Sequence, residues 1–129
     1  MPRKKTAAVR LNRAHSSILH RSSELDAFVD QFLSIVCDTS RRYILELLAA
    51  PNDNDPSVPT ELRSGEIAQE LGLSSATTSE HLRQLANLHM VTTRKQGTAV
   101  YYRLSNHLLV QAFLDLLRTL EQYYQKQLS

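Results

Sequence analysis

Cysteine, glycine and long apolar runs are scarce in this 129-residue chain, and each scarcity excludes a class of protein. Cys37 is the single cysteine, so no internal disulfide can form and no multi-thiolate zinc site can be built within one chain. No run approaches the roughly 18 apolar residues that cross a bilayer. Residues 1–15 have the charge of a signal peptide but no apolar segment. We therefore expect a cytoplasmic protein with no zinc finger and no membrane partner.

Motifs of common enzymes are missing as well. The chain has three glycines and no glycine-rich phosphate loop, and no paired-carboxylate motif or Ser-His-Asp arrangement stands out. Its 42% apolar and 22% charged residues are typical of a folded domain, and its length fits one such domain. We expect one folded domain that is not an enzyme.

Charge is distributed unevenly along the chain. Residues 1–21 carry six bases and no acid, whereas the remaining residues hold nine bases against 13 acids. A basic terminus of this kind predicts a flexible arm over residues 1–22, followed by a folded domain over residues 23–127. Residues 73–104 hold four bases and one acid, a local excess that favours phosphate binding. The alternative is that both regions carry solubilising charge with no partner.

Apolar residues recur at helical spacing in four segments before residue 90. The first helix is expected from Ser23, and the second begins near Arg41 and ends before Pro51. A polar, proline-punctuated loop over residues 51–63 follows. The third helix is short and begins near Ser64, and the fourth is capped by Ser74 or Ser75.

The third and fourth helices have the spacing of a helix-turn-helix. Gly72 stands where a left-handed residue can end a helix, and Leu73 is expected to fill the turn. The small side chain of Ala68 lets the two helices approach each other closely. The buried stripe of the fourth helix is expected at Thr78, Leu82, Leu85 and Leu88.

After the fourth helix the pattern changes from helical to strand-like. Residues 90–95 and 99–104 are rich in β-branched and aromatic side chains, and Gly97 lies between them, where a tight turn favours glycine. A ribbon of two strands directly after a helix-turn-helix predicts a wing. We expect Arg94 and Lys95 at its tip.

The segment over residues 105–128 predicts a long final helix with an apolar stripe that a body of this size cannot cover. The expected fold is therefore mainly α with a small β-hairpin, a winged helix-turn-helix of order α-α-α-α-β-β-α. We expect a second copy of the chain to pack against the apolar faces of the first and last helices and to bury them. The residues expected to form this homodimer are Leu25, Phe28, Phe32, Leu109, Phe113, Leu116, Leu117, Leu120 and Tyr124.

The string IAQELGLSSATTSEHLRQLANLHMVTTRKQGTAVYYRLS, with this order of elements, resembles the ArsR/SmtB family of bacterial winged-helix repressors. The resemblance covers residues 24–125. It implies a homodimer that binds a double-stranded DNA operator and leaves it when an effector binds. The residues that match the family string are Leu73, Ser74, Thr77, Ser79, His81, Leu82, Leu85, Val91, Arg94, Gly97, Tyr102 and Leu104.

Under this reading, the start of the fourth helix selects the DNA sequence, and the wing adds affinity. Small and hydroxylated side chains there allow the backbone to approach the groove. Glu80 departs from the family, which often has a base at that place. The residues expected to contact DNA are Ser75, Ala76, Thr77, Ser79, Glu80 and Arg83 in the helix, and Arg94, Lys95, Gln96 and Thr98 in the wing. His81 is expected to orient the helix by bonding to the scaffold.

The metal sites that the family implies are not matched. The thiol pair of its arsenic sensors corresponds to residues 61–67, which read ELRSGEI. Its zinc and cobalt ligands near the final helix correspond to positions that hold Asn106, Leu108, Thr119 and Gln122, none of them a strong ligand. A weaker alternative is a nickel or zinc site in which His15 and His20 are joined by His107 or Glu121 of the partner subunit.

Cys37 is interpreted as a small buried residue, with a sensing thiol as the alternative if nearby Arg41 and Arg42 lower its pKa. The sequence does not identify an effector. The resemblance to the family also allows a regulator with no metal-sensing ability. A winged-helix module that binds protein instead of DNA is the second hypothesis. It predicts that neutralising Arg94 and Lys95 leaves partner binding unchanged.

Overall fold

The computed structural model of the chain describes residues 21–105 and 107–128. The chain divides after Ser34 into two units. The predicted arm over residues 1–22 lies almost wholly outside the described residues. None of the described helices is long and apolar enough to cross a bilayer.

The described part of the first unit is most of helix α3 (Ser23–Val36). Ser22 caps this helix, because its Oγ accepts a hydrogen bond of 3.1 Å from the backbone N–H of Leu25. The rings of Phe28 and Phe32 stack one turn apart with their centroids 6.5 Å from each other. Leu25 and Phe28 are about half exposed, so this helix presents apolar surface.

The second unit begins with helix α4 (Thr39–Ala49), which is capped by Asp38. The Asp38 carboxylate accepts a hydrogen bond of 3.0 Å from the backbone N–H of Arg41, which lowers the pKa of Asp38. Ile44, Leu45 and Leu48 of α4 are buried. This helix is therefore a central element of the core.

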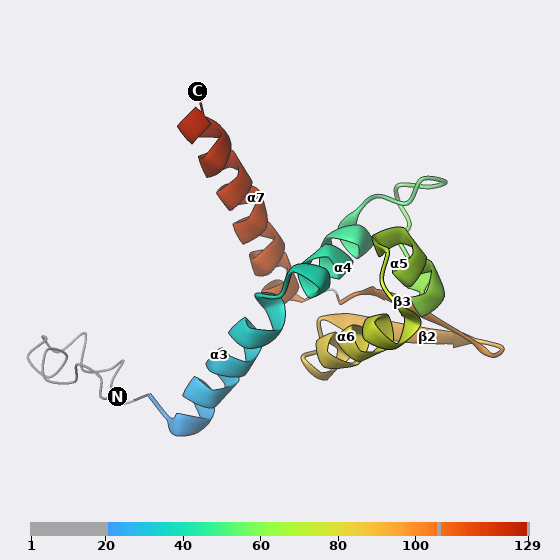
Figure 1. Cartoon of the computed structure of the whole chain (residues 1–129), viewed down its shortest axis with the longest axis horizontal. Coiled ribbons are helices and arrows are strands. Elements are labelled where there is room, and N and C mark those ends of the chain that lie inside the picture. Colours follow the sequence, from blue (N-terminus) through green and yellow to red (C-terminus); the bar gives the residue numbers. More distant parts are fainter. Residues whose placement is uncertain (1–20, 106, 129) are drawn as a thin grey trace, which may run out of the picture. The chain divides into compact units, whose positions relative to one another are not determined.

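The helix-turn-helix consists of α5 (Ser64–Leu71) and α6 (Ser75–Asn87) (Figure 1). Gly72 ends α5 in the left-handed conformation, with φ at 68°, as expected for a helix-terminal glycine. Ser74 caps α6. The predicted buried stripe of α6 is confirmed, since Thr78, Leu82, Leu85 and Leu88 are all buried.

A three-stranded antiparallel sheet follows, with the strand order β1-β3-β2. The predicted hairpin is β2 (Val91–Gln96) and β3 (Ala99–Leu104). Strand β1 (Leu62–Arg63) had been assigned to the polar loop, and this assignment was wrong. Two residues are too few to show an alternating pattern, and β1 is identifiable only by its pairing with Tyr102 and Tyr101 of β3.

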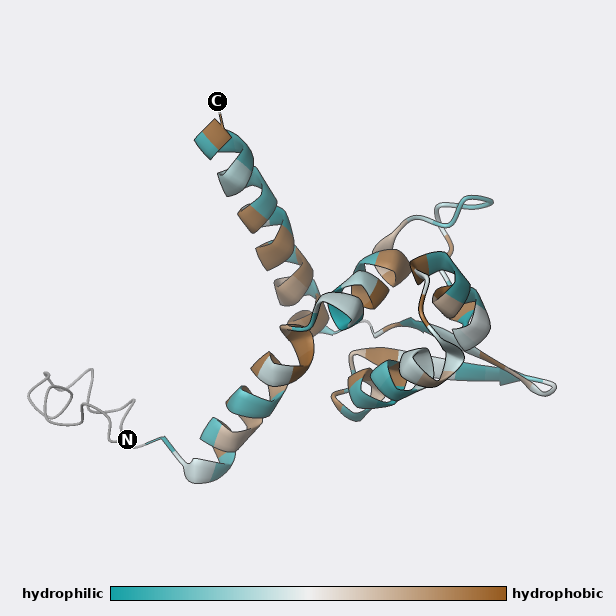
Figure 2. Cartoon of the chain, in the orientation of Figure 1, coloured by the Kyte–Doolittle hydropathy of each residue, from teal (hydrophilic) through white to brown (hydrophobic). Residues whose placement is uncertain are grey.

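The last helix, α7 (Leu108–Leu128), buries Val110 and Phe113 near its start. Beyond them Leu114 and Leu117 are half-buried and the other apolar side chains are exposed. Figure 2 shows hydrophobic residues recurring along the helix. The predicted fold, a mainly α winged helix-turn-helix with a small sheet, is confirmed, with β1 as an additional strand.

Candidate nucleic-acid interface

Helix α6 separates into a buried face and an exposed face at its first two turns. Thr78 and Leu82 are fully buried, and the Thr78 hydroxyl donates a hydrogen bond of 2.9 Å to the backbone oxygen of Ser74. This packing fixes the rotation of the helix about its axis. It leaves on the outside the six helix residues that were expected to contact DNA: Ser75, Ala76, Thr77, Ser79, Glu80 and Arg83.

The start of α6 is held by a pair of hydroxyl groups. Ser74 Oγ accepts a hydrogen bond of 3.1 Å from the backbone N–H of Thr77 and donates one of 2.9 Å to Thr77 Oγ1. The hydroxyl hydrogen of Thr77 therefore remains available for another acceptor. The first backbone N–H groups of a helix also lack partners within it, and they favour phosphate.

One turn further along, the carboxylate of Glu80 accepts hydrogen bonds from two other side chains of α6. Arg83 donates to both carboxylate oxygens of Glu80, one of these contacts measuring 3.0 Å, and Gln84 Nε2 donates over 2.9 Å. These hydrogen bonds lower the pKa of Glu80 to about 2. The structure thus pairs two of the expected DNA contacts, Glu80 and Arg83, with each other. Binding of Glu80 to a base stays a prediction.

His81 contacts the scaffold, on the side of α6 toward α4. Its Nδ1 lies 3.0 Å from Nη1 of Arg41, and because Arg is always a donor, this nitrogen accepts the bond. Arg41 Nε also donates to the backbone oxygen of Ile35 over 2.6 Å. Arg41 therefore connects the start of α4 to α6. The expected hydrogen bond of His81 to the scaffold is confirmed, but its partner, Arg41, lies 40 positions earlier in the chain and was not predicted.

The wing places Arg94 away from its tip. Gly97 adopts a left-handed φ of 63° in the turn, and the last pair of the ladder joins Gln96 to Ala99. Arg94 lies two residues before this pair, opposite Tyr101. The expectation that Arg94 and Lys95 both lie at the tip was therefore wrong for Arg94.

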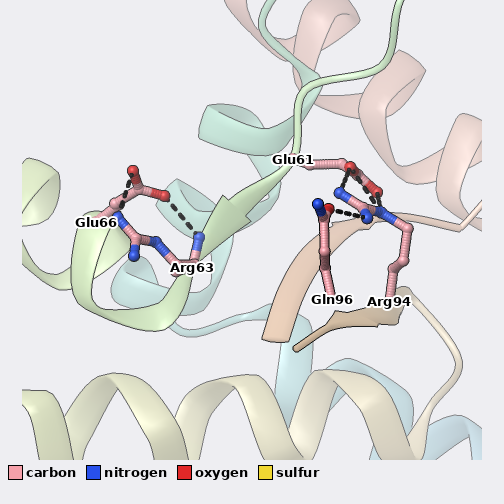
Figure 3. A network of polar contacts seen from close by, with 5 residues as sticks. All are labelled: Glu61, Arg63, Glu66, Arg94 and Gln96. Carbon is pink, nitrogen blue, oxygen red and sulfur yellow. Dashed lines mark hydrogen bonds and ion pairs between the residues drawn. The ribbon is translucent and has the colours of Figure 1, made fainter. Parts of the chain in front are cut away.

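Arg94 contacts three other side chains, and Figure 3 shows two of them, Glu61 and Gln96. It makes contacts of 2.8, 3.1 and 3.2 Å with the carboxylate of Glu61, and its Nη1 donates to Gln96 Oε1 over 2.8 Å. Its guanidinium also lies 4.8 Å from the centroid of the Tyr101 ring. The hydrogen bond from Arg94 lowers the pKa of Glu61.

Strand pairing explains why Glu61 reaches Arg94. Arg94, Tyr101 and Arg63 form one row across the sheet, so their side chains share a face. Glu61 lies two residues before Arg63, and the alternation of side chains points it to the same face. Lys95, by contrast, is exposed and makes no hydrogen bond or ion pair within the part of the chain that the structure describes.

The segments before and after the wing are joined by hydrogen bonds to one backbone oxygen, that of His89. The backbone oxygen of His89 accepts hydrogen bonds from Ser105 Oγ and, over 2.6 Å, from His107 Nε2. A carbonyl can only accept, so His107 carries a hydrogen on Nε2 in this contact. His89 itself has a left-handed φ of 59°. The end of α6 is thereby joined to the start of α7, which the sequence pattern did not indicate.

The structure describes some of the residues that were considered as a sensor, and others lie outside the described residues. Cys37 is exposed, so its interpretation as a buried residue was wrong. It lies in the short turn between α3 and α4, where neighbours do not cover it. His15, His20 and Asn106 lie outside the described residues. Among the residues that are described, no group of three or more His, Cys, Asp or Glu side chains is placed to hold a metal ion.

The sequence of the chain is similar to those of known regulatory proteins. Residues 38–93 match the family described as "Bacterial regulatory protein, arsR family". The transcriptional regulator KmtR of Mycobacterium tuberculosis is 31% identical over 67% of this chain, and the match spans 60% of that protein. The arsenical resistance operon repressor of Staphylococcus xylosus is 30% identical over 70% of this chain and 80% of its own length.

A solved structure extends the similarity to the fold. HlyU from Vibrio cholerae superposes with a TM-score of 0.59 at 30% identity, over 77% of this chain and 97% of that one. The sequence match and the fold agree with the exposed recognition helix and wing. The chain therefore belongs to the arsR family of bacterial regulatory proteins, a family of DNA-binding transcriptional regulators.

Proposed function

We propose that the chain is a homodimeric repressor that binds a double-stranded DNA operator and leaves it when an effector binds. The observation that carries this proposal is the division of α6. Thr78, Leu82 and Leu85 fix the helix in the core, and an exposed row of small and hydroxylated residues begins at its N-terminus. A recognition helix reads the major groove with its N-terminal residues, and bulky side chains there would hold the backbone away.

In this proposal the helix selects the sequence and the wing supplies affinity. Ser75 and Ser79 donate to phosphates or base edges, and Ala76 with the Thr77 methyl group contacts a thymine methyl. Lys95 neutralises a phosphate, and Gln96 and Thr98 approach the backbone. Arg94 differs from Lys95 because it must first release Glu61 to bind DNA.

Exposed apolar side chains support the homodimer. Leu116, Leu120 and Tyr124 of α7 are each more than half exposed, and they recur on one face of the helix. Leu25 and Phe28 of α3 are also exposed. Phe113 is mostly buried within its own chain, so the proposed contact rests on the exposed residues. Apolar surface of this extent favours association between copies.

The proposal assigns the chain no enzymatic activity and no resident metal, and it places the chain in the bacterial cytoplasm, on the nucleoid. The nickel or zinc alternative through His15, His20 and His107 is testable by metal analysis of the full chain. One bound ion per chain or per dimer, lost from a His107→Ala variant, would favour the alternative.

The experiment for the main proposal is a fluorescence-anisotropy scan. Labelled duplexes that tile the DNA upstream of the gene are titrated with the full chain at several salt concentrations. We expect one duplex to bind far more tightly than the others, and all binding to weaken steeply with salt because counterions are released. Sedimentation velocity on the same sample should give a dimer. Equal binding to every duplex and to random DNA would overturn the proposal.

A further inference from the structure

A cavity of about 700 Å³ lies in the second unit, and none of its lining residues belongs to α5 or α6. It is formed by the end of α4, the loop over residues 56–60, the base of the hairpin and one face of α7. Leu48, Val58, Leu104 and Leu114 provide apolar lining. Its volume falls within the range of about 300–1,000 Å³ that is typical of small-molecule sites.

The charged groups of the cavity lining are both arginines, Arg103 and Arg118. Arg118 is paired with Asp115 of the same helix. Arg103 makes no hydrogen bond or ion pair within the described part of the chain, although the charge of Glu61 is close enough to interact with it. The guanidinium of Arg103 therefore keeps its donors available, and a planar fork of this kind suits a carboxylate or a phosphate.

The charge of the cavity lining indicates whether a carboxylate or a phosphate fits better. Of the two arginines in the lining, Arg118 is paired with Asp115, which leaves the charge of Arg103 as an excess of one positive charge in the lining. A single negative charge balances this excess, whereas a phosphate monoester near neutral pH carries about 1.5 to 2 charges. We propose that the cavity binds a small organic monocarboxylate with an apolar body, and that this ligand is the effector.

The position of the cavity connects such a ligand to DNA binding, and this step rests on the proposed function. Gln111, Leu114 and Arg118 line the cavity, whereas Leu116 and Leu120 lie on the opposite face of α7. This follows from a helical advance of about 100° per residue. A ligand there contacts the helix that carries the proposed dimer face. A shift of α7 changes the spacing of two recognition helices, and the ligand then favours one dimer geometry by its differential affinity.

The cavity also reaches the wing. Thr92 of β2 and Ser105 after β3 belong to its lining, and the Ser105 hydroxyl donates to the backbone oxygen of His89. A ligand in contact with Ser105 is therefore one hydrogen bond away from His89, which lies two residues beyond the end of α6.

The first experiment measures binding by the full chain without DNA. Isothermal titration calorimetry is run with benzoate, 2-naphthoate and octanoate, and with 2-naphthamide and phenyl phosphate as comparisons. We expect saturable binding of at least one carboxylate, weaker binding of the phosphate and none of the amide. Arg103→Gln should reduce the affinity at least tenfold, and Gln111→Glu should reduce it by repelling the carboxylate. Arg63→Gln, the matched control, removes a positive charge from the same sheet face outside the cavity and should change nothing.

Circular dichroism of each variant shows whether it is folded, and both cavity substitutions are at exposed positions. Absence of saturable binding by all three carboxylates at millimolar concentration overturns the proposal. So does binding that the amide matches, or binding that both Arg103→Gln and Gln111→Glu leave unchanged. Tighter binding of the phosphate would reject the monocarboxylate class.

The second experiment adds the carboxylate to the protein–operator complex. Operator affinity should fall at least fivefold for the native chain and stay unchanged for Arg103→Gln. Carboxylate binding with no change in operator affinity overturns the role as effector and leaves the repressor proposal intact. Failure of the native chain to select any operator, with carboxylate binding intact, overturns the repressor proposal instead.

Discussion

The carboxylate of Glu61 and the guanidinium of Arg94 meet across the middle strand of the sheet, with three N–O contacts of 2.8 to 3.2 Å. Glu61 precedes β1 and Arg94 belongs to β2, and β3 lies between these strands. The pair thus spans the sheet and neutralises a cation that the sequence pattern had assigned to DNA. Because both side chains are partly exposed, the pair is weak enough for a phosphate to compete with Glu61.

Glu61→Gln should raise the affinity for all DNA sequences, because it frees Arg94 and removes a negative charge beside the wing. The slope of log affinity against log salt concentration should become steeper by about one phosphate contact. Anisotropy titrations on operator and random duplexes measure both quantities. Glu70→Gln, the control, removes an equal charge from α5 without touching either arginine. A lower affinity for Glu61→Gln than for this control would show that Glu61 positions Arg94 for DNA rather than competing with it.

Lys95→Ala should weaken binding to every sequence more than Arg94→Ala does. Lys95 has no partner to give up among the described residues, whereas Arg94 must break its contacts with Glu61. The salt slope should fall by about one phosphate contact for Lys95→Ala and by less for Arg94→Ala. The same titrations over a series of salt concentrations decide this. The reverse order of the two slopes would contradict the assignment of Lys95 as the principal phosphate contact of the wing.

Thr77→Ala should relax sequence preference and leave binding to random DNA unchanged. The substitution removes one methyl contact and one hydroxyl, and a loss on the order of 1 kcal/mol corresponds to about fivefold in operator affinity. Competition between operator and random duplexes measures the ratio, and circular dichroism controls for loss of the Ser74 cap. An equal loss on both kinds of DNA would place Thr77 on phosphate instead of base edges.

Arg83→Gln should raise the pKa of Glu80 from about 2 toward its ordinary value of 4.5. The carboxylate pKa is depressed in the folded chain, so the ion pair is complete above pH 4.5 and is lost as the pH falls through about 2. Carboxyl ¹³C NMR of Glu80 follows the titration directly. Gln84→Ala should cause a smaller rise, because its hydrogen bond contributes less than that of Arg83. An unchanged pKa in Arg83→Gln would show that the pair is absent in solution.

Glu80→Ala should raise the affinity for random DNA and blur the preferred site. Without Glu80, Arg83 is free to bind phosphates of any sequence, and a possible acceptor for a cytosine amino group is lost. Selection from a randomised duplex pool measures both effects. If neither occurs, Glu80 belongs to a solvated face and selects nothing.

Periodicity was sufficient to predict which face of α6 is buried. The stripe from Thr78 to Leu88 and the order of helices and hairpin followed from spacing alone. Spacing does not indicate which partner an exposed polar side chain will find. Arg94 and Glu61 lie 33 residues apart, and Arg41 and His81 lie 40 apart, so both pairs depend on the assembled fold. Strand β1 was missed for the same reason, because two residues become a strand only when β3 is beside them.

Leu120→Glu should convert the dimer to a monomer and weaken operator binding much more than binding to a half-site. Leu120 is half exposed on the apolar face of α7, and a charge there would be buried without a partner on dimerisation. Gln122→Glu is the matched control, since it adds the same charge on the opposite face of the same helix. Sedimentation velocity gives the oligomeric state, and anisotropy compares a full operator with a half-site. A Leu120→Glu variant that stays dimeric would move the interface off this face of α7 and leave α3 as the surface to be tested next.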